Sequence, residues 1–214
     1  MEDRLLGKKP YALYRDPLVI IFVILLFLLL CRILFAVRFM GIYVVGDSMS
    51  PGLTGAASRG VPGGDFLFVD KFDAPDYGDI VVLEKPYASP DSEDKYVIKR
   101  VIALGGDKVY MEDGVVYVMY EGEEQYTVLE EDYVLEENCD PLLPYNTYRS
   151  ADDPMVVGED EIFVLGDNRN VSHDSRYDDY GCFNYSQLVG VITDWSYACK
   201  PFFTALYTFF TFGV

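Results

Sequence analysis

The stretch from Tyr96 to Met119, YVIKRVIALGGDKVYMEDGVVYVM, predicts three consecutive β-strands. β-Branched and aromatic residues fill its three runs, and glycine-containing turns separate them. Asp-Gly between two apolar runs is a strong hairpin signal. The runs and turns are Tyr96–Leu104, Gly105–Asp107, Lys108–Met111, Glu112–Gly114 and Val115–Met119. We therefore expect an antiparallel sheet here.

The same pattern continues on both sides of this stretch. Further predicted strands are Ile42–Val45, Phe66–Val69, Ile80–Leu83, Ile162–Leu165 and Leu188–Thr193. Short, numerous strands between Gly, Pro and Asp clusters are typical of a mainly β, antiparallel core, expected over residues 41–200. Residues 121–157 interrupt the pattern, because they are acidic and contain three prolines. We interpret this region as an inserted cap, at about residues 105–160.

Ahead of the core lies one long apolar segment, Pro17–Val37, PLVIIFVILLFLLLCRILFAV, whose only charge is Arg32. About twenty helical residues at ~1.5 Å each cover about 30 Å, the thickness of a bilayer core. The sequence therefore predicts a transmembrane helix over 17–38. The competing interpretation is a cleavable signal peptide, but that needs a shorter apolar run and a small-x-small cleavage site, which residues 32–38 do not supply.

Charges beside this segment predict its orientation. Four basic residues precede it, namely Arg4, Lys8, Lys9 and Arg15. Basic residues favour the cytoplasmic side, and Arg32 and Arg38 weaken this asymmetry without reversing it. We expect a single-pass protein of the cell membrane, with residues 1–16 cytoplasmic and the domain 41–200 extracytoplasmic.

The charge distribution also limits the class of partner. Of 17 Lys/Arg and 35 Asp/Glu in the chain, residues 41–214 hold 11 and 32, a net charge of −21. Such a body would repel nucleic-acid phosphates, so we expect no nucleic-acid partner. The four cysteines, Cys31, Cys139, Cys182 and Cys199, show no CxxC spacing, so we expect no metal site and no cofactor. One disulfide among the last three, or three free thiols, both remain open.

The apolar C-terminal tail, residues 201–214, has no charged residue and is rich in phenylalanine. As a helix it would be about 21 Å long, too short to span a bilayer. Two interpretations remain: a closing strand or core helix, or an interfacial patch that rests on lipid.

Ser48, in the run Gly46-Asp47-Ser48-Met49-Ser50-Pro51, is the candidate nucleophile. The residue before a proline is pushed toward extended geometry, so no helix is expected to start directly after Ser48. A nucleophile elbow of the strand–turn–helix type is therefore disfavoured. We expect Ser48 at the end of an extended strand that begins at Ile42. Taken alone, an ordinary turn serine is the alternative.

A nucleophilic serine needs a base, and the chain has one histidine, His173. A lysine can serve instead if burial keeps it neutral. Lys99 lies inside an apolar strand, and its neighbour Arg100 must face the other way. Lowering a lysine pKa from about 10.4 to about 7 costs about 4 kcal/mol, which the fold must supply. The alternative is a Lys99 that points outward into water.

A third segment, Val164–Arg176, places many polar residues directly after an apolar strand. Such a loop suits an active site, because Ser172 can hydrogen-bond a neutral lysine and Asp/Arg pairs can fix the backbone. A plain polar turn is the alternative. His173 beside Asp174 also suggests a histidine base, but adjacent residues rarely form a base and its orienting group.

These segments together resemble bacterial type I signal peptidase, the leader peptidase. The four matching motifs, in the family's order, are Gly46–Leu53, Tyr77–Val82, Lys99–Asp107 and Gly166–Arg176. The resemblance covers the chain from the apolar segment to about Thr193. It implies a β-fold with an inserted cap and a membrane-bound serine endopeptidase that removes signal peptides from exported preproteins.

The resemblance also implies residue roles. Ser48 would be the nucleophile and Lys99 the general base, with Ser172 orienting the Lys99 amine. The implied structural pairs are Asp167 with Arg100 and Asp174 with Arg176. The backbone N–H of Ser48 would donate to the oxyanion, while Gly46 supplies no hydroxyl as a second donor. Preprotein signal peptides would bind as a strand beside residues 42–47 and 96–99, over small pockets for which Ile42, Val44 and Ile98 are candidates.

Two other functions stay open from the sequence alone. One is a specialised Ser–Lys maturation peptidase with a dedicated substrate. The other is a non-catalytic, membrane-anchored assembly protein. Retention of both Ser48 and Lys99 speaks against the second.

Overall fold

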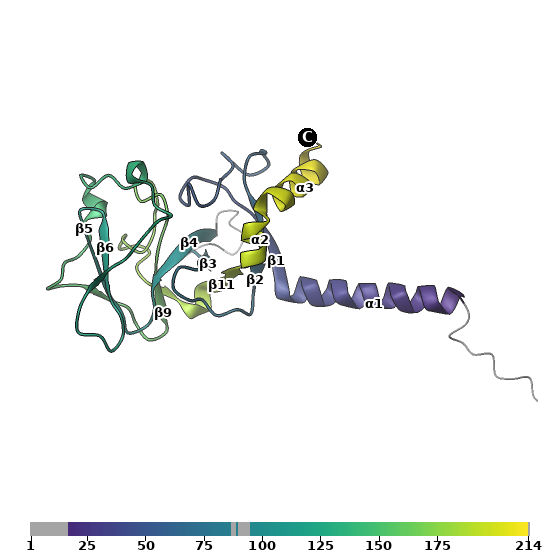
Figure 1. The fold of residues 1–214 in the computed structure, drawn as a ribbon, viewed down its shortest axis with the longest axis horizontal. Coiled ribbons are helices and arrows are strands. Elements are labelled where there is room, and N and C mark those ends of the chain that lie inside the picture. Colours follow the sequence, from purple (N-terminus) through teal and green to yellow (C-terminus); the bar gives the residue numbers. More distant parts are fainter. Residues whose placement is uncertain (1–16, 87–88, 90–94, 214) are drawn as a thin grey trace, which may run out of the picture. The chain divides into compact units, whose positions relative to one another are not determined.

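The computed structural model describes residues 17–86, 89 and 95–213. The chain divides into two units, with the boundary between Phe39 and Met40. The first unit contains α1 (Pro17–Arg38), a 22-residue helix with no buried side chain (Figure 1). It is long and apolar enough to cross a membrane, and Arg38 in its last turn complements the helix dipole. The predicted helix over 17–38 is confirmed.

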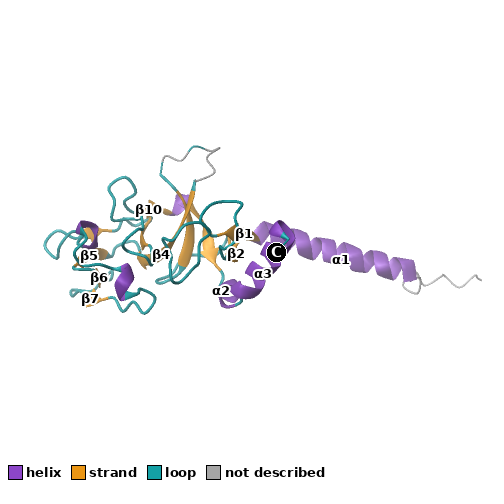
Figure 2. Cartoon of the chain, turned by 90° about the horizontal axis from the view of Figure 1, so that it is seen from above, coloured by secondary structure: helices purple, strands orange, loops and turns teal. Residues whose placement is uncertain are grey.

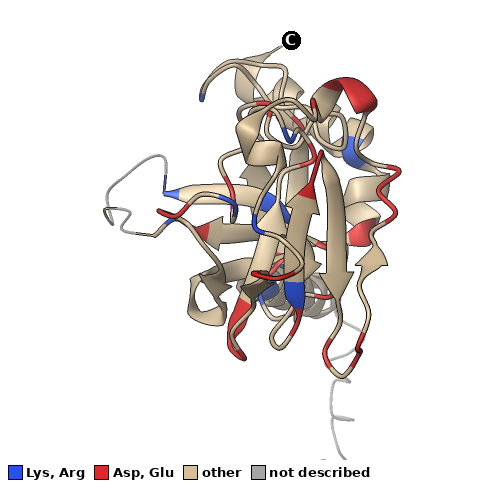
Figure 3. Ribbon diagram, turned by 90° about the vertical axis from the view of Figure 1, so that its left-hand side faces the viewer, with Lys and Arg blue, Asp and Glu red and all other residues tan. Residues whose placement is uncertain are grey.

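The second unit is built mainly from β-strands (Figure 2). Its strands are β1 (Phe39–Tyr43), β2 (Phe66–Asp70), β3 (Ile80–Glu84), β4 (Tyr96–Ala103), β5 (Lys108–Glu112), β6 (Val115–Met119), β7 (Thr127–Val128), β8 (Met155–Val156), β9 (Glu161–Leu165), β10 (Phe183–Asn184) and β11 (Leu188–Ile192). Its helices are α2 (Asp194–Ala198) and α3 (Lys200–Phe212), with short 3-10 turns at Glu136–Asn138, Pro144–Asn146 and Tyr185–Gln187. Carboxylates lie mostly in loops and at strand ends (Figure 3).

Two sheets organise this unit. The larger has seven strands in the order β1-β2-β11-β3-β4-β9-β10, and the smaller has four in the order β7-β6-β5-β8. The strand pairs β2–β11, β11–β3, β3–β4 and β4–β9 are antiparallel, as are those of the smaller sheet. The expectation of a mainly β, antiparallel fold is therefore confirmed. The smaller sheet comes from residues 108–156, within the region where the sequence predicts a cap.

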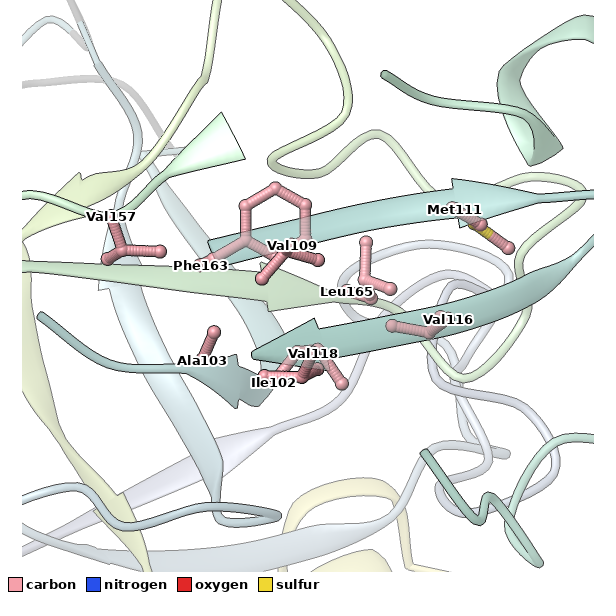
Figure 4. Packing of buried hydrophobic residues seen from close by; sticks show 9 residues of the cluster. All are labelled: Ile102, Ala103, Val109, Met111, Val116, Val118, Val157, Phe163 and Leu165. Atoms are coloured by element: carbon pink, nitrogen blue, oxygen red, sulfur yellow. The ribbon is translucent and has the colours of Figure 1, made fainter. Parts of the chain in front are cut away.

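Side chains of the central strand β3 are buried on both faces of the larger sheet. Ile80 and Val82 of β3 pack in one buried cluster, while Val81 and Leu83 pack in another. This is the period-two pattern of a strand buried on both faces. A third cluster lies between β4, β5, β6 and β9, around Phe163 (Figure 4).

One predicted strand is wrong in its position. The run expected at Ile42–Val45 forms a strand at Phe39–Tyr43 instead. Gly46 has a φ of 81°, a left-handed conformation that favours glycine and ends extended structure. The three two-residue strands β7, β8 and β10 were not predicted, because two residues give no measurable alternation.

Candidate active site

Ser48 lies in a turn and not at the end of a strand, which corrects the sequence expectation. β1 ends at Tyr43, five residues earlier. The turn is closed by the N–H of Leu53, which donates to the Met49 carbonyl at 2.8 Å. Met49 and Leu53 are fully buried, so their packing holds the turn against the sheet. The Ser48 hydroxyl is thereby presented from a fixed piece of backbone.

Lys99 comes from the middle of β4, where it pairs in register with Val81 of β3. Its side chain is 2 % exposed, and its Nζ lies 3.0 Å from Ser48 Oγ. The amine also donates to the Ile98 carbonyl at 3.0 Å. The alternative of an outward, solvated Lys99 is therefore not what the structure shows.

Burial lowers the pKa of Lys99 from 10.5 to about 8. Burial dominates, because an ammonium without water around it is costly. The positive charges of Lys85 and Arg176 lower the pKa further, while Asp174 opposes them. Near pH 8 a large fraction of the amine is uncharged and able to accept a proton.

Arg100, the next residue of β4, points to the opposite face and meets Asp167. Its Nε and Nη2 donate to the two carboxylate oxygens of Asp167 at 2.8 and 2.7 Å. Its Nη1 donates to the Gly78 carbonyl at 2.8 Å. The ring of Tyr133 lies 3.9 Å from the guanidinium carbon. This two-pronged ion pair ties the loop after β9 to β4.

The second predicted pair, Asp174 with Arg176, is also formed. Arg176 Nε and Nη2 donate to Asp174 at 2.8 and 3.0 Å, and both residues are buried. Burial alone would raise the pKa of Asp174, but Arg176 and the N–H of Gly166 outweigh it, and the pKa is lowered. Asp174 therefore stays ionised and accepts the Gly166 N–H at 3.0 Å.

This loop contacts the Ser48 turn directly. The N–H of Asn168 donates to the Ser48 carbonyl at 3.1 Å. Gly166 is required here, because a Cβ at this position would collide with the Ser48 carbonyl and with Ser172 Oγ. Ser172 is buried beside it, but within the described residues its hydroxyl makes no hydrogen bond to Lys99. The structure thus brings Ser172 to the site without placing it on the amine.

Sequence reasoning missed a contact from the insert. Glu131 pairs with the fully buried Arg169 through both guanidinium Nη atoms, and Tyr133 donates to Glu131 at 2.7 Å. Arg169 Nε also donates to the Gly166 carbonyl at 3.0 Å. Because a buried arginine needs a carboxylate partner, Arg169 in the polar loop was a signal that such a partner existed. Its position at Glu131 was not visible in the sequence.

A cleft of about 590 Å³ opens at the Ser48–Lys99 pair. All three predicted pocket residues line it, namely Ile42, Val44 and Ile98. Tyr207 of α3 lines it as well, with its ring stacked on Phe66 at 4.5 Å and on Tyr43 at 5.1 Å. Nothing in the sequence near Tyr207 indicated that the tail reaches this cleft.

The edge of β4 toward this cleft is open. β4 pairs with β3 from Tyr96 to Arg100, but its pairing with β9 begins only at Arg100. Among the described residues, 96–99 therefore have a ladder on one side only, and all four line the cleft. An open strand edge can pair with an extended peptide.

His173 has a different environment. Its Nε2 lies 2.9 Å from Asp179 Oδ1, and its ring stacks on Tyr177 at 4.1 Å. Its side chain is 45 % exposed. In the described part of the chain it makes no hydrogen bond to Ser48 or Lys99.

Among the described residues there is no group of three or more His, Cys, Asp and Glu side chains placed to hold a metal ion. All four cysteines are free thiols in this structure, which favours the interpretation without a disulfide.

Comparisons with known proteins identify relatives of this chain. The family described as "Signal peptidase, peptidase S26" matches residues 15–195. A "Probable signal peptidase I-1" of Synechocystis sp. is 33% identical over 190 residues, covering 85% of this chain and 82% of the relative. "Signal peptidase I S" of Bacillus subtilis is 33% identical, covering 69% and 72%. A crystal structure of a signal peptidase I from Enterococcus faecalis V583 is 27% identical, with a TM-score of 0.42, covering 56% of this chain and 98% of that one.

Proposed function

The chain belongs to the signal peptidase family, peptidase S26, and from this premise we propose that it removes signal peptides from preproteins with Ser48 as nucleophile and Lys99 as general base. The family membership establishes a serine endopeptidase. The residue roles are supported by one observation above all: a buried Lys99 amine lies 3.0 Å from the Ser48 hydroxyl.

In the proposed first step, Ser48 Oγ attacks the scissile carbonyl while uncharged Lys99 takes its proton. A C–O bond forms and the carbonyl oxygen becomes an oxyanion. The backbone N–H of Ser48 donates to that oxyanion, a type of contact worth about 3 kcal/mol. The Lys99 ammonium then gives its proton to the leaving amine as the C–N bond breaks, which leaves an ester on Ser48.

In the second step, a water molecule attacks the ester while Lys99 again accepts a proton. The ester C–O bond breaks, Ser48 recovers its proton from Lys99, and the signal peptide leaves with a new C-terminal carboxylate. Arg100–Asp167 and Asp174–Arg176 act as structural locks, because they fix the loop whose Asn168 N–H holds the Ser48 backbone. Ser172, buried in the same loop, is the residue to which we assign the orienting of the amine.

The substrate binds as an added strand between residues 42–47 and the open edge of residues 96–99. Side chains of the bound peptide alternate, so every second one points into the cleft. Ile42, Val44 and Ile98 line the cleft with apolar side chains, and we assign them to the pockets for small side chains before the scissile bond. This matches a peptide with alanine at the residue before the cut and two residues earlier.

α1 anchors the enzyme in the cell membrane, with its N-terminus cytoplasmic and the β-domain outside. Its length, its lack of any buried side chain and the basic residues before it support this topology. Tethering keeps the cleft near signal peptides that are still held in the bilayer.

The direct test incubates the purified full chain, in detergent or liposomes, with one secretory preprotein. Sequencing the new N-terminus shows whether cleavage follows a small-x-small motif. The Ser48→Ala variant, prepared identically, is the control for contaminating proteases. Cleavage that persists in Ser48→Ala, or a cut at unrelated sites, would refute the assignment.

A further inference from the structure

α3 carries a single charged residue, Lys200 at its first position, and all its other residues are uncharged. Residues 201–214 contain no Lys, Arg, Asp or Glu. The helix runs from Lys200 to Phe212 and ends in a left-handed Gly213. One face is fixed to the sheet, and the other is apolar and exposed.

The inward face is held by specific contacts to β2 and β1. Thr204 Oγ1 accepts the N–H of Phe66 at 2.9 Å. Phe203 packs edge-on against Phe68 at 5.4 Å, and Tyr207 stacks on Phe66 and Tyr43. α3 is therefore a fixed part of the β-domain and not a loose tail.

The outward face consists of four large apolar side chains at helical spacing. Phe202, Leu206, Phe209 and Phe210 are 63, 45, 63 and 76 % exposed. The spacing of four, three and one residues places them on one side of the helix. A contiguous apolar stripe of this kind on a protein surface marks a contact site.

α1 and the strand that α3 contacts are joined by a short segment of chain. Arg38 ends α1, and Tyr43 follows five residues later at the end of β1. Five extended residues reach at most about 17 Å. Tyr207 of α3 stacks on Tyr43 at 5.1 Å, so this short segment also separates the residues that α3 contacts from the last turn of α1 in the chain.

A second copy of the chain fits this stripe less well than lipid. A phenylalanine can bury about 200 Å², so four partly exposed side chains offer about 500 Å². A stable protein interface needs about 800 Å² from each partner. The stripe is too small to hold a dimer by itself, whereas an interfacial helix buries a surface of this size among acyl chains.

We propose that α3 is a second membrane contact, which lies in the bilayer interface with Phe202, Leu206, Phe209 and Phe210 among the lipid chains. This rests on the proposed anchoring by α1. The same helix carries Tyr207 in the wall of the cleft on its other face. The cleft is thus held beside the lipid surface from which a signal peptide arrives.

Fluorescence quenching in liposomes tests the contact on the full chain. Trp195 is the single tryptophan, so a Trp195→Phe background allows one reporter at a time. Phe210→Trp reports on the outward face of α3. Leu142→Trp, at a position that is 87 % exposed, is the matched control elsewhere in the β-domain. Both proteins are inserted in phosphatidylcholine vesicles with and without a lipid that carries a doxyl quencher near the headgroup.

We expect the quencher to reduce emission from residue 210 severalfold more than emission from residue 142. Equal quenching at both positions would overturn the proposal, since the contact would not belong to α3. Blue-shifted but unquenched emission from residue 210 would also overturn it, and would point to a second copy as the occupant. Cleavage of a preprotein by each variant verifies that the enzyme is folded, and loss of that cleavage in the parent protein would instead refute the proposed function.

Discussion

At Lys99 a single side chain must be buried and yet be able to carry a charge. The fold holds it at 2 % exposure, 3.0 Å from Ser48 Oγ, and burial lowers its pKa to about 8. An ordinary lysine would be protonated at neutral pH and could not accept the serine proton. In the proposed mechanism, the cost of burial is therefore what lets the amine act as a base.

Removing either member of the pair should abolish cleavage. We expect Ser48→Ala and Lys99→Met each to lower kcat/KM for a preprotein by about four orders of magnitude. Methionine fills the buried space of Lys99 without its amine, so the fold should persist by circular dichroism. His173→Ala is the matched control and should cleave at nearly the parent rate. An inactive His173→Ala beside an active Lys99→Met would reverse the base assignment.

The rate should also depend on pH in a defined direction. Because the uncharged amine is reactive, kcat/KM should rise about tenfold per pH unit below pH 8 and level off above it. The charge on Lys85 lowers the Lys99 pKa. Removing that charge should therefore raise the pKa, move the rise in kcat/KM to higher pH and leave its plateau unchanged. A profile that is flat from about pH 6 to 10 would contradict a lysine base.

At the scale of elements, the active site depends on a segment far from it in sequence. Residues 129–133 of the insert reach the loop after β9, where Glu131 neutralises buried Arg169 and Tyr133 covers Arg100. Those contacts fix the loop that holds the Ser48 turn. The insert thus holds the loop after β9 in place, and it also forms the smaller sheet.

Breaking the Glu131–Arg169 ion pair should lower the free energy of unfolding. Glu131→Gln leaves the Arg169 guanidinium buried without its counter-charge, which typically costs about 3–5 kcal/mol. Thermal unfolding of the detergent-solubilised protein would show this as a lowered Tm. Glu130→Gln removes an exposed charge one residue away and should leave Tm nearly unchanged. Equal Tm values for the two variants would show that Glu131 does not hold the loop.

α3 contributes to the cleft through one ring. Tyr207→Ala should widen the cleft wall and raise KM for a soluble signal-peptide substrate about fivefold, since an aromatic contact is worth about 1 kcal/mol. The plateau of kcat should change little, because the ring of Tyr207 packs on Phe66 and Tyr43 and takes no part in the proposed proton transfer. Phe210→Ala, on the other face of the same helix, should leave KM unchanged with a soluble peptide in detergent. A Tyr207→Ala enzyme with normal KM would exclude this wall from substrate binding.

At the scale of the whole molecule, a strongly acidic domain follows a basic, apolar N-terminal segment. This asymmetry predicts a cytoplasmic N-terminus and an external β-domain. Cysteine labelling in intact cells can test it, because burial raises the pKa of Cys182 to about 12 and raises that of Cys139, so both react slowly.

In a Cys199→Ser background, Leu142→Cys should react with a membrane-impermeant maleimide. Leu5→Cys should react only after the cells are opened. The reverse pattern would invert the topology. Labelling of both in intact cells would show that the membrane was not intact, and a lysed sample of each variant controls for reactivity.

The sequence by itself determined most of the elements and the motifs that carry the proposed chemistry. Strand runs such as Ile80–Leu83 and Val115–Met119, the helix over 17–38 and the Ser48 and Lys99 motifs are local patterns that few neighbouring residues specify. Only the tertiary structure decided which of these segments contact one another. No local pattern records contacts between segments that lie dozens of residues apart in the chain. Examples are the Glu131–Arg169 ion pair, Tyr207 in the cleft and the open edge of residues 96–99. The proton chemistry needs both, because only the folded chain excludes water from an amine that the sequence merely places in a strand.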